Sequence, residues 1–174
     1  MLAEPIAPSI VTTRRVTAAD MADILALGAR VYGPGRFSRT AFRVREGTPD
    51  ISPFCRLAEL DGRVIASIRM TEVTIGDAEG VLLLGPLTVD PRFENKGYGR
   101  RLMIESMDAG RQAGHRLVVL VGDLAYYARV GFGVVPPGQI LLPGPVNPAR
   151  LLACELCPGA LTAYRGMMAA SPAA

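Results

Sequence analysis

The sequence predicts an α/β fold of the α+β kind, with a mixed sheet that is antiparallel in its first half and has one parallel β-α-β step in its second. Two observations carry this prediction. Three strand-like segments before residue 90 are joined by short turns, which force antiparallel pairing. After residue 90 the apolar spacing becomes helical, and a fully apolar strand follows, as in a crossover connection.

Length and composition indicate one globular domain. The chain has 174 residues, of which 49% are hydrophobic and 20% charged. We expect a loose Ala- and Pro-rich tail at residues 1–8 and a single domain over residues 9–170. Neither a signal-peptide pattern nor an apolar run of membrane-spanning length is visible, so we expect a cytoplasmic protein without a membrane partner.

The charges favour a small anionic ligand over a nucleic acid. The net charge is +3, Lys96 is the only lysine, and the arginines are spread along the chain. A nucleic-acid surface needs a concentrated basic patch, so we predict no nucleic-acid partner; a merely solvated surface is the alternative. With His115 as the only histidine, no four-ligand zinc site can form in one chain, and we predict no metal. The three cysteines are interpreted as buried or incidental thiols.

The first predicted elements are a strand and two helices. Ile10–Val16 is rich in β-branched residues, and Thr17 followed by Asp20 marks a helix start. Apolar residues then recur at helical spacing up to the breaker Tyr32–Gly35. A second, short helix is expected at Phe37–Arg45.

A meander of three strands follows. Pro53–Leu60 and Arg63–Ile75 are predicted strands joined at Asp61-Gly62, a pair that tolerates the positive φ of a hairpin turn. A second turn at Gly76–Gly80 leads into a third strand, Val81–Val89. These connections predict antiparallel neighbours.

The second half begins with a polar, glycine-containing loop at Asp90–Gly99. A helix follows and ends near Gly114, and the apolar strand Leu117–Val121 should lie parallel to the third strand of the meander. A short helix is expected at Ala125–Val130. Weaker strands are expected at Gln139–Leu142 and Leu151–Leu156.

The loop before the long helix has the features of a phosphate site. Gly97 and Gly99 stand at a helix start, where free N–H groups and the positive helix end favour an anion. Glycine also lets a ligand approach the backbone. Lys96, Arg100 and Arg101 add positive charge. The alternatives are a tight turn for the glycines and a solvated helix face for the charges.

Two other phosphate loops fit less well. A P-loop needs Lys and Ser or Thr after its second glycine, where this chain has Arg100-Arg101. The dinucleotide fingerprint would need its third glycine at Leu102. Asp123 lies where a ribose-binding acid would stand, but there is one β-α-β unit where that fold needs several.

A bulge is predicted where Gly85-Pro86 interrupts the third strand of the meander, because proline cannot donate a ladder hydrogen bond. Such a bulge would splay this strand from its parallel neighbour. The gap would expose the backbone of Leu87 and Val89 to an extended, amide-bearing ligand with the shape of a pantetheine arm.

Three segments resemble the GNAT superfamily of acyl-CoA-dependent N-acetyltransferases, especially its YhbS-like bacterial branch. Leu84–Pro91 resembles the strand that lines CoA, Lys96–Leu102 the pyrophosphate loop, and Gly122–Phe132 the later helix. The resemblance implies a GNAT-like fold and acetyl-CoA as co-substrate. It implies these cofactor-binding residues: Leu87, Thr88, Val89, Asn95, Lys96, Gly97, Tyr98, Gly99, Arg100 and Arg129.

The resemblance also implies that Tyr127 is the catalytic general acid, protonating the departing thiolate; packing is the alternative role. Tyr126 is interpreted as structural. The loop departs from the family pattern at Glu94 and Asn95, where Gln or Arg and often Gly are usual. The charge of Glu94 could weaken CoA affinity unless the side chain points away.

The acceptor side is less determined. The expected partner is a small-molecule or peptide amine, in a pocket built from Tyr32–Phe37, the strand near Arg69 and the C-terminal segment. Arg69 could recognise an acceptor carboxylate or be an edge charge. Glu59 and Glu72 could act as a base through water, and the general base is left unassigned.

The predicted function is transfer of the acetyl group from acetyl-CoA to an amine by direct attack in a ternary complex. A covalent cysteine route is disfavoured because no cysteine lies in Val81–Phe132. The alternatives are a non-catalytic acyl-CoA-binding or regulatory module, an acyltransferase with another acyl donor, and a structural partner protein. A homodimer through the apolar segment Leu151–Leu156 is one option.

Overall fold

The computed structural model describes residues 10–35 and 39–172. The predicted tail, residues 1–8, lies outside the described residues, and so does the beginning of the predicted helix Phe37–Arg45. The strands are β1 (Val11–Arg15), β2 (Arg56–Leu60), β3 (Arg63–Ile75), β4 (Ala78–Val89), β5 (Leu117–Val121), β6 (Gly133–Val134), β7 (Ile140–Leu141), β8 (Leu151–Glu155) and β9 (Gly166–Ala170). The α-helices are α1 (Met21–Tyr32), α2 (Thr40–Arg45), α3 (Tyr98–Gln112) and α4 (Leu124–Tyr127).

The strands form one mixed sheet in the order β1-β2-β3-β4-β5-β8-β6. Neighbours along this path are antiparallel except β4 and β5, which are parallel. The predicted antiparallel meander and the predicted parallel step are therefore confirmed. The short strand β9 pairs antiparallel with the end of β3 and parallel with β7, a second parallel pair that the sequence did not predict.

Several boundaries follow the predicted turn chemistry. The strands β3 and β5 have the predicted bounds, and Asp61 and Gly62 adopt the positive φ values of 49° and 75° expected for the hairpin turn. The start of β4 was predicted three residues late. Ile75 pairs with Ala78, so the turn holds only two residues and the strand continues through the polar segment after it.

The segment Leu151–Leu156, considered above for a homodimer, lies mostly in the strand β8. It lies between β5 and β6 and pairs with both. Its first four residues, Leu151–Cys154, are buried. The part Leu151–Ala153 therefore has a neighbour on both sides, and a homodimer stays a prediction.

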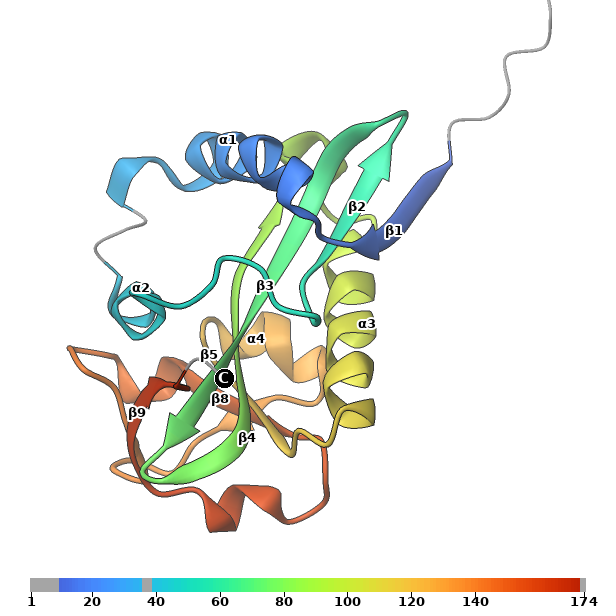
Figure 1. Ribbon diagram of the computed structural model, residues 1–174. Coiled ribbons are helices and arrows are strands. Elements are labelled where there is room, and N and C mark those ends of the chain that lie inside the picture. The colour runs from blue at the N-terminus through green and yellow to red at the C-terminus, as the bar shows by residue number, and fades with distance from the viewer. Residues whose placement is uncertain (1–9, 36–38, 173–174) are drawn as a thin grey trace, which may run out of the picture.

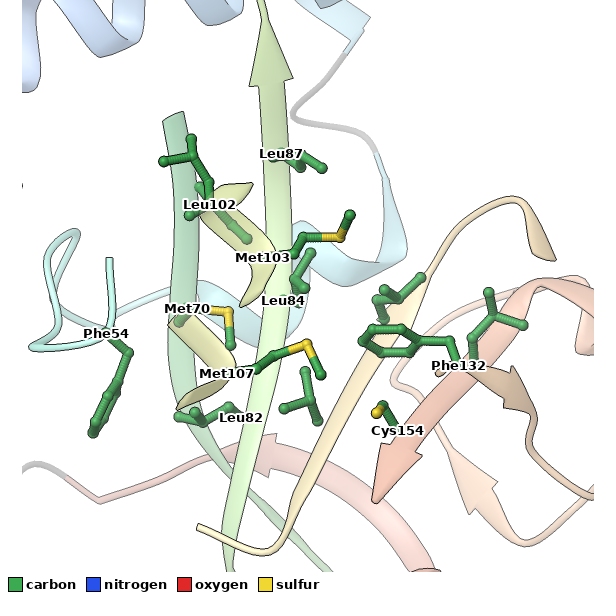
Figure 2. Close-up of a cluster of buried hydrophobic side chains, with 14 of the residues drawn as sticks. Phe54, Met70, Leu82, Leu84, Leu87, Leu102, Met103, Met107, Phe132 and Cys154 are labelled. Carbon is green, nitrogen blue, oxygen red and sulfur yellow. The ribbon is translucent and has the colours of Figure 1, made fainter. Parts of the chain in front are cut away.

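Helices cover the two faces of the sheet, with α3 on one side of the β3–β4 ribbon and α2 on the other (Figure 1). The α3 side holds a large apolar cluster in which β4 meets α3, with Leu82, Leu84, Leu102, Met103 and Met107 among its members (Figure 2). The alternate β4 residues Val81 and Leu83 join a second cluster with Val44 of α2. Within the described ranges, no helix is long and apolar enough to cross a membrane.

The bulge in β4 is confirmed. Ile68 of β3 pairs with Leu87, whereas Met70 pairs with Leu84, so Gly85-Pro86 stands opposite a single β3 residue. Because proline supplies no N–H, the ladder is interrupted at this point.

The two parallel strands separate where the bulge begins. Their pairing joins Val81–Leu83 to Leu117–Val119. Towards its carboxyl end β5 leans away from β4 (Figure 2). On its β5 side the second half of β4, Leu84–Val89, therefore has no ladder partner, and its residues Leu84–Thr88 line an opening together with Val121 at the end of β5.

Candidate functional site

The loop between β4 and α3 has the geometry of an anion-binding turn. Asn95 and Gly97 have positive φ values of 59° and 85°, and Gly97 is the N-cap residue of α3. The first hydrogen bond into the helix runs from the Arg101 N–H to the Gly97 carbonyl at 2.9 Å. The N–H groups of Tyr98–Arg100 belong to the first turn, where a helix offers no partner. The predicted loop residues thus meet at one helix mouth, whose partial positive charge favours an anion.

Asp90 anchors this loop to the sheet. Its N–H donates to the Ile65 carbonyl at 2.8 Å, and its buried carboxylate accepts from the Arg92 backbone N–H at 3.0 Å and from Arg92 Nη2 at 2.8 Å. The Arg92 hydrogen bond lowers the pKa of Asp90 to about 2. The carboxylate therefore stays ionised at neutral pH and fixes the start of the 3₁₀ turn Pro91–Phe93.

Apart from Asp90, the charged side chains of the loop are exposed. Lys96 and Arg100 face solvent, and the Lys96 ammonium lies 5.3 Å from the centre of the Phe93 ring. Glu94 is also exposed, and its charge helps to raise the pKa of Tyr32. Glu94 therefore lies within electrostatic reach of the opening between the strands.

Tyr126 lies at the mouth of α3, a position that its predicted structural role did not anticipate. A Cβ built on Gly99 would come within 2.7 Å of the Tyr126 hydroxyl and 3.4 Å of Val89 Cγ2. Tyr126 is 44% exposed, and burial raises its pKa, which the nearby Arg129 charge opposes. Its position next to Tyr127 in the family-like motif is the signal that could have drawn attention to it.

Tyr127 is held in place by its packing. Its ring centre lies 4.9 Å from that of Tyr126 and 5.8 Å from that of Phe132, and a Cβ on Gly122 would come within 2.5 Å of the ring. Burial raises the pKa of Tyr127 far above its usual value, and the neighbouring Tyr32 and Tyr126 act in the same direction. The phenol therefore carries its proton at neutral pH.

The strand Leu87–Val89 borders the opening. Leu87 and Thr88 are buried, and Val89 packs against the α3 side. Tyr32, the last residue of α1, donates its hydroxyl hydrogen to the Leu87 carbonyl. Burial is the main cause that raises the pKa of Tyr32.

A cavity of about 640 Å³ lies on the α1 and α2 side of β3 and β4. Tyr32 and Tyr127 both line it, together with Leu84–Thr88. The cavity is positively charged, because its described lining holds four arginines and one carboxylate: Arg39, Arg45, Arg69, Arg150 and Asp50. An anionic or carboxylate-bearing molecule is favoured there.

Some of the residues predicted for the acceptor pocket line this cavity, whereas the described residues 33–35 of the predicted segment Tyr32–Phe37 do not. Tyr32 and Arg69 are among them, and the later part of the chain contributes Pro145–Asn147 and Arg150. Residues 36 and 37 of the predicted segment Tyr32–Phe37 lie outside the described residues.

The two glutamates considered as bases lie elsewhere. Glu59 forms an ion pair with Arg14 at 2.9 Å, and Glu72 lies 3.2 Å from His115 Nε2. Neither lines the cavity. Asp123, which a dinucleotide site would need, instead caps α4 by accepting from the Ala125 N–H at 3.1 Å.

Comparisons with known proteins agree with this architecture. Residues 21–132 match the model of the acetyltransferase (GNAT) family. YhbS of Escherichia coli K12, an uncharacterized N-acetyltransferase, is 27% identical over 109 residues, which are 62% of this chain and 65% of YhbS. That match therefore spans just under two thirds of the relative.

Two solved structures are similar in fold. The structure of E. coli YhbS in complex with CoA has a TM-score of 0.78 at 23% identity and covers 98% of this chain and 94% of that one. A GNAT family acetyltransferase from Brucella melitensis, in complex with acetyl-CoA, has a TM-score of 0.60 at 30% identity and covers 83% and 95%.

Fold and family model together place the chain in the class of the acetyltransferases. More narrowly, the chain belongs to the acetyltransferase (GNAT) family. The mixed sheet with its antiparallel strands and one parallel pair along the main path matches the fold of the similar structures.

Proposed function

We propose that this protein transfers the acetyl group of acetyl-CoA to a primary amine by direct attack within a ternary complex. The observation that carries the proposal is that Tyr127, Val121 of β5 and the unpaired part of β4 line one opening, while the first turn of α3 lies against Leu87 and Val89. This arrangement suits a long ligand with an anionic diphosphate, an amide-bearing arm and a reactive thioester.

The amides at Gly97–Arg100 would bind the diphosphate, with Lys96 and Arg100 adding charge. The pantetheine arm would run along Leu87–Val89, and the Tyr126 hydroxyl and Arg129 would border it at the helix mouth. Asn95, with its positive φ, would turn the loop so that its backbone faces the ligand.

Tyr127 would act as the general acid. The amine, having lost one proton, forms the new C–N bond at the thioester carbon, and the C–S bond breaks. The thiolate takes the Tyr127 proton, the nitrogen releases its second proton to water, and the Tyr127 phenolate takes a proton back from water before the next turnover. Because burial keeps the phenol protonated, the acid is available throughout the neutral pH range.

The amine would lose its first proton to water. Asp50 is the only carboxylate among the described lining residues, and it lies 3.3 Å from Arg69 Nη1. No buried base is therefore invoked, and the fraction of neutral amine sets the rate.

A non-catalytic acyl-CoA-binding module is the second candidate, favoured by the exposed charge of Glu94 near the loop and by the lack of a free carboxylate in the described lining. Calorimetry with acetyl-CoA tests whether the protein binds this ligand, and thiol release against an amine panel tests turnover. Binding without thiol release for any amine would favour the module. The same assay with longer acyl-CoA donors tests the other acyl-donor alternative, and the cytoplasm stays the predicted compartment.

A further inference from the structure

A buried arginine in the cavity has no acidic partner among the residues that the structure describes. Arg45, on the last turn of α2, is only 7% exposed. Its Nη2 donates to the Leu84 carbonyl at 3.3 Å, and its Nε has no hydrogen-bond partner among the described residues. None of the ion pairs within residues 10–35 and 39–172 involves it. A buried, unpaired charge is costly, and proteins rarely retain one without a use.

Arg69 brings a second guanidinium to the same wall. Its Nη1 lies 3.3 Å from Asp50, whose side chain is 70% exposed, and its Nη2 donates to Thr48 Oγ1 at 3.0 Å. Its Nε is buried without a partner among the described residues. Burial, and secondarily the charge of Arg69, lowers the pKa of Arg45. An anion bound between Arg45 and Arg69 would offset both the cost of burying the Arg45 charge and its repulsion by Arg69.

The two arginines lie close to the predicted reaction centre. Arg45 contacts the Leu84 carbonyl, and Leu87, whose carbonyl accepts from Tyr32, is three residues further along β4. Because of the bulge, Leu84 and Leu87 stand opposite Met70 and Ile68, which are two residues apart on β3, or about 7 Å of strand. An acceptor that fits this span, with its anionic group at Arg45 and its reacting amine beside Leu87, can have only a few bonds between the two groups.

We propose that the acceptor is a small α-amino acid or a closely related aminocarboxylate, whose carboxylate binds between Arg45 and Arg69. The planar guanidinium matches a carboxylate through paired N–H donors, which a point charge does not. The amine then faces the opening beside Leu87 and Tyr127. The proposal rests on the proposed acetyl transfer, since it names the acceptor of that same site.

A purely structural role for Arg45 makes a different prediction. Arg45 Nη2 would lie 3.1 Å from a Cβ on Gly85, so the side chain also fills space beside the bulge. If filling were its function, Arg45→Met should destabilise the fold. If the charge is kept for a ligand, Arg45→Met should leave the melting temperature unchanged or raise it, because an unpaired buried charge is removed.

The test measures how tightly amino acids bind to the CoA-loaded protein, with calorimetry and thermal shift as the two readouts. Each of a panel of L-amino acids is paired with its own α-carboxamide, which keeps the amine and side chain and removes the carboxylate charge. We expect the wild type to bind at least one acid at least about 30-fold more tightly than its amide. That preference should disappear in Arg45→Met and weaken in Arg69→Met.

Arg43→Met is the matched control. Arg43 is exposed on the same helix, its Nη1 lies 3.5 Å from the Pro143 carbonyl, and it does not line the cavity. This variant should keep the wild-type preference. Equal binding of acids and amides, which a peptide acceptor predicts, or no binding of any acid would overturn the proposal. So would an unchanged preference in Arg45→Met, or a fall of its melting temperature by more than about 5 °C. CoA binding and thiol release with neutral amines, measured separately, show whether acetyl transfer itself fails.

Discussion

Replacing Gly122 with alanine should displace Tyr127 without touching the α3 loop. The added Cβ would lie 2.5 Å from Tyr127 Cε2 and 2.9 Å from Leu120 Cδ1. Carbon atoms in ordinary contact are about 3.5–4.0 Å apart, so the ring must move by about 1 Å. Overpacking of this kind costs about 1–3 kcal/mol, which corresponds to a fall in melting temperature of about 2–12 °C for a chain of this size.

The same displacement should reduce turnover. A shift of about 1 Å in a reacting group can cost about 100-fold in rate, so we expect kcat of Gly122→Ala to fall by about that factor. The KM for acetyl-CoA should change little, since Gly97 and Gly99 are not involved. Thiol release under saturating acetyl-CoA measures kcat, and differential scanning calorimetry measures the melting temperature.

Gly133→Ala is the matched control for this prediction. A Cβ on Gly133 meets no atom within 4 Å, and the residue needs no positive φ. Its melting temperature and kcat should match the wild type. Full activity and unchanged stability in Gly122→Ala would refute the view that close packing against Gly122 positions the Tyr127 phenol.

Three further predictions concern the acid, the pH profile and the loop anchor. Tyr127→Phe keeps the ring contacts and removes the proton, so kcat should fall by about 10²–10⁴-fold with little change in the KM for acetyl-CoA; steady-state kinetics would show a small effect if Tyr127 only packs. Because burial raises the pKa of Tyr127, kcat/KM should rise with pH as the acceptor amine deprotonates, and a decline between pH 7 and 9 would contradict this. Asp90→Asn should cost about 1–3 kcal/mol at neutral pH. The pKa of Asp90 is lowered to about 2, so its contribution is complete above an unfolded pKa of about 4 and is lost as pH falls through about 2. The difference in free energy of unfolding between wild type and variant, followed by urea titration, should therefore narrow over that window; a difference that stays constant down to pH 2 argues against ionised Asp90 as the anchor.

The sequence predicts the parts of the fold whose local signals agree with their tertiary setting. The strand β5 is a continuous apolar run between polar turns, and the β2–β3 hairpin is marked by Asp61-Gly62. The short strands β6 and β9 carry no such signal. Gly166–Ala170 is a strand because it pairs with β3 and β7, not because its glycine, methionine and alanine residues favour one.

The candidate site likewise has features that the sequence predicts and features that only the tertiary structure reveals. The free amides of α3 and the splay at Gly85-Pro86 follow from local backbone chemistry, so glycine and proline positions predict them. The burial of Arg45 depends on how α2 packs over β4, and a lone arginine at a helix end predicts only a solvated charge. The approach of the Tyr126 hydroxyl to Gly99 likewise joins segments far apart in the sequence.

The binding of a diphosphate by the first amides of α3 can be observed directly by NMR. Amide spectra of the ¹⁵N-labelled protein are recorded during titration with CoA and, separately, with pantetheine, which lacks the diphosphate. We predict that CoA shifts the Gly97, Tyr98 and Gly99 amide signals most strongly and that pantetheine leaves them nearly unchanged. If CoA binds while these three signals stay in place, the diphosphate lies elsewhere and the proposed site is wrong.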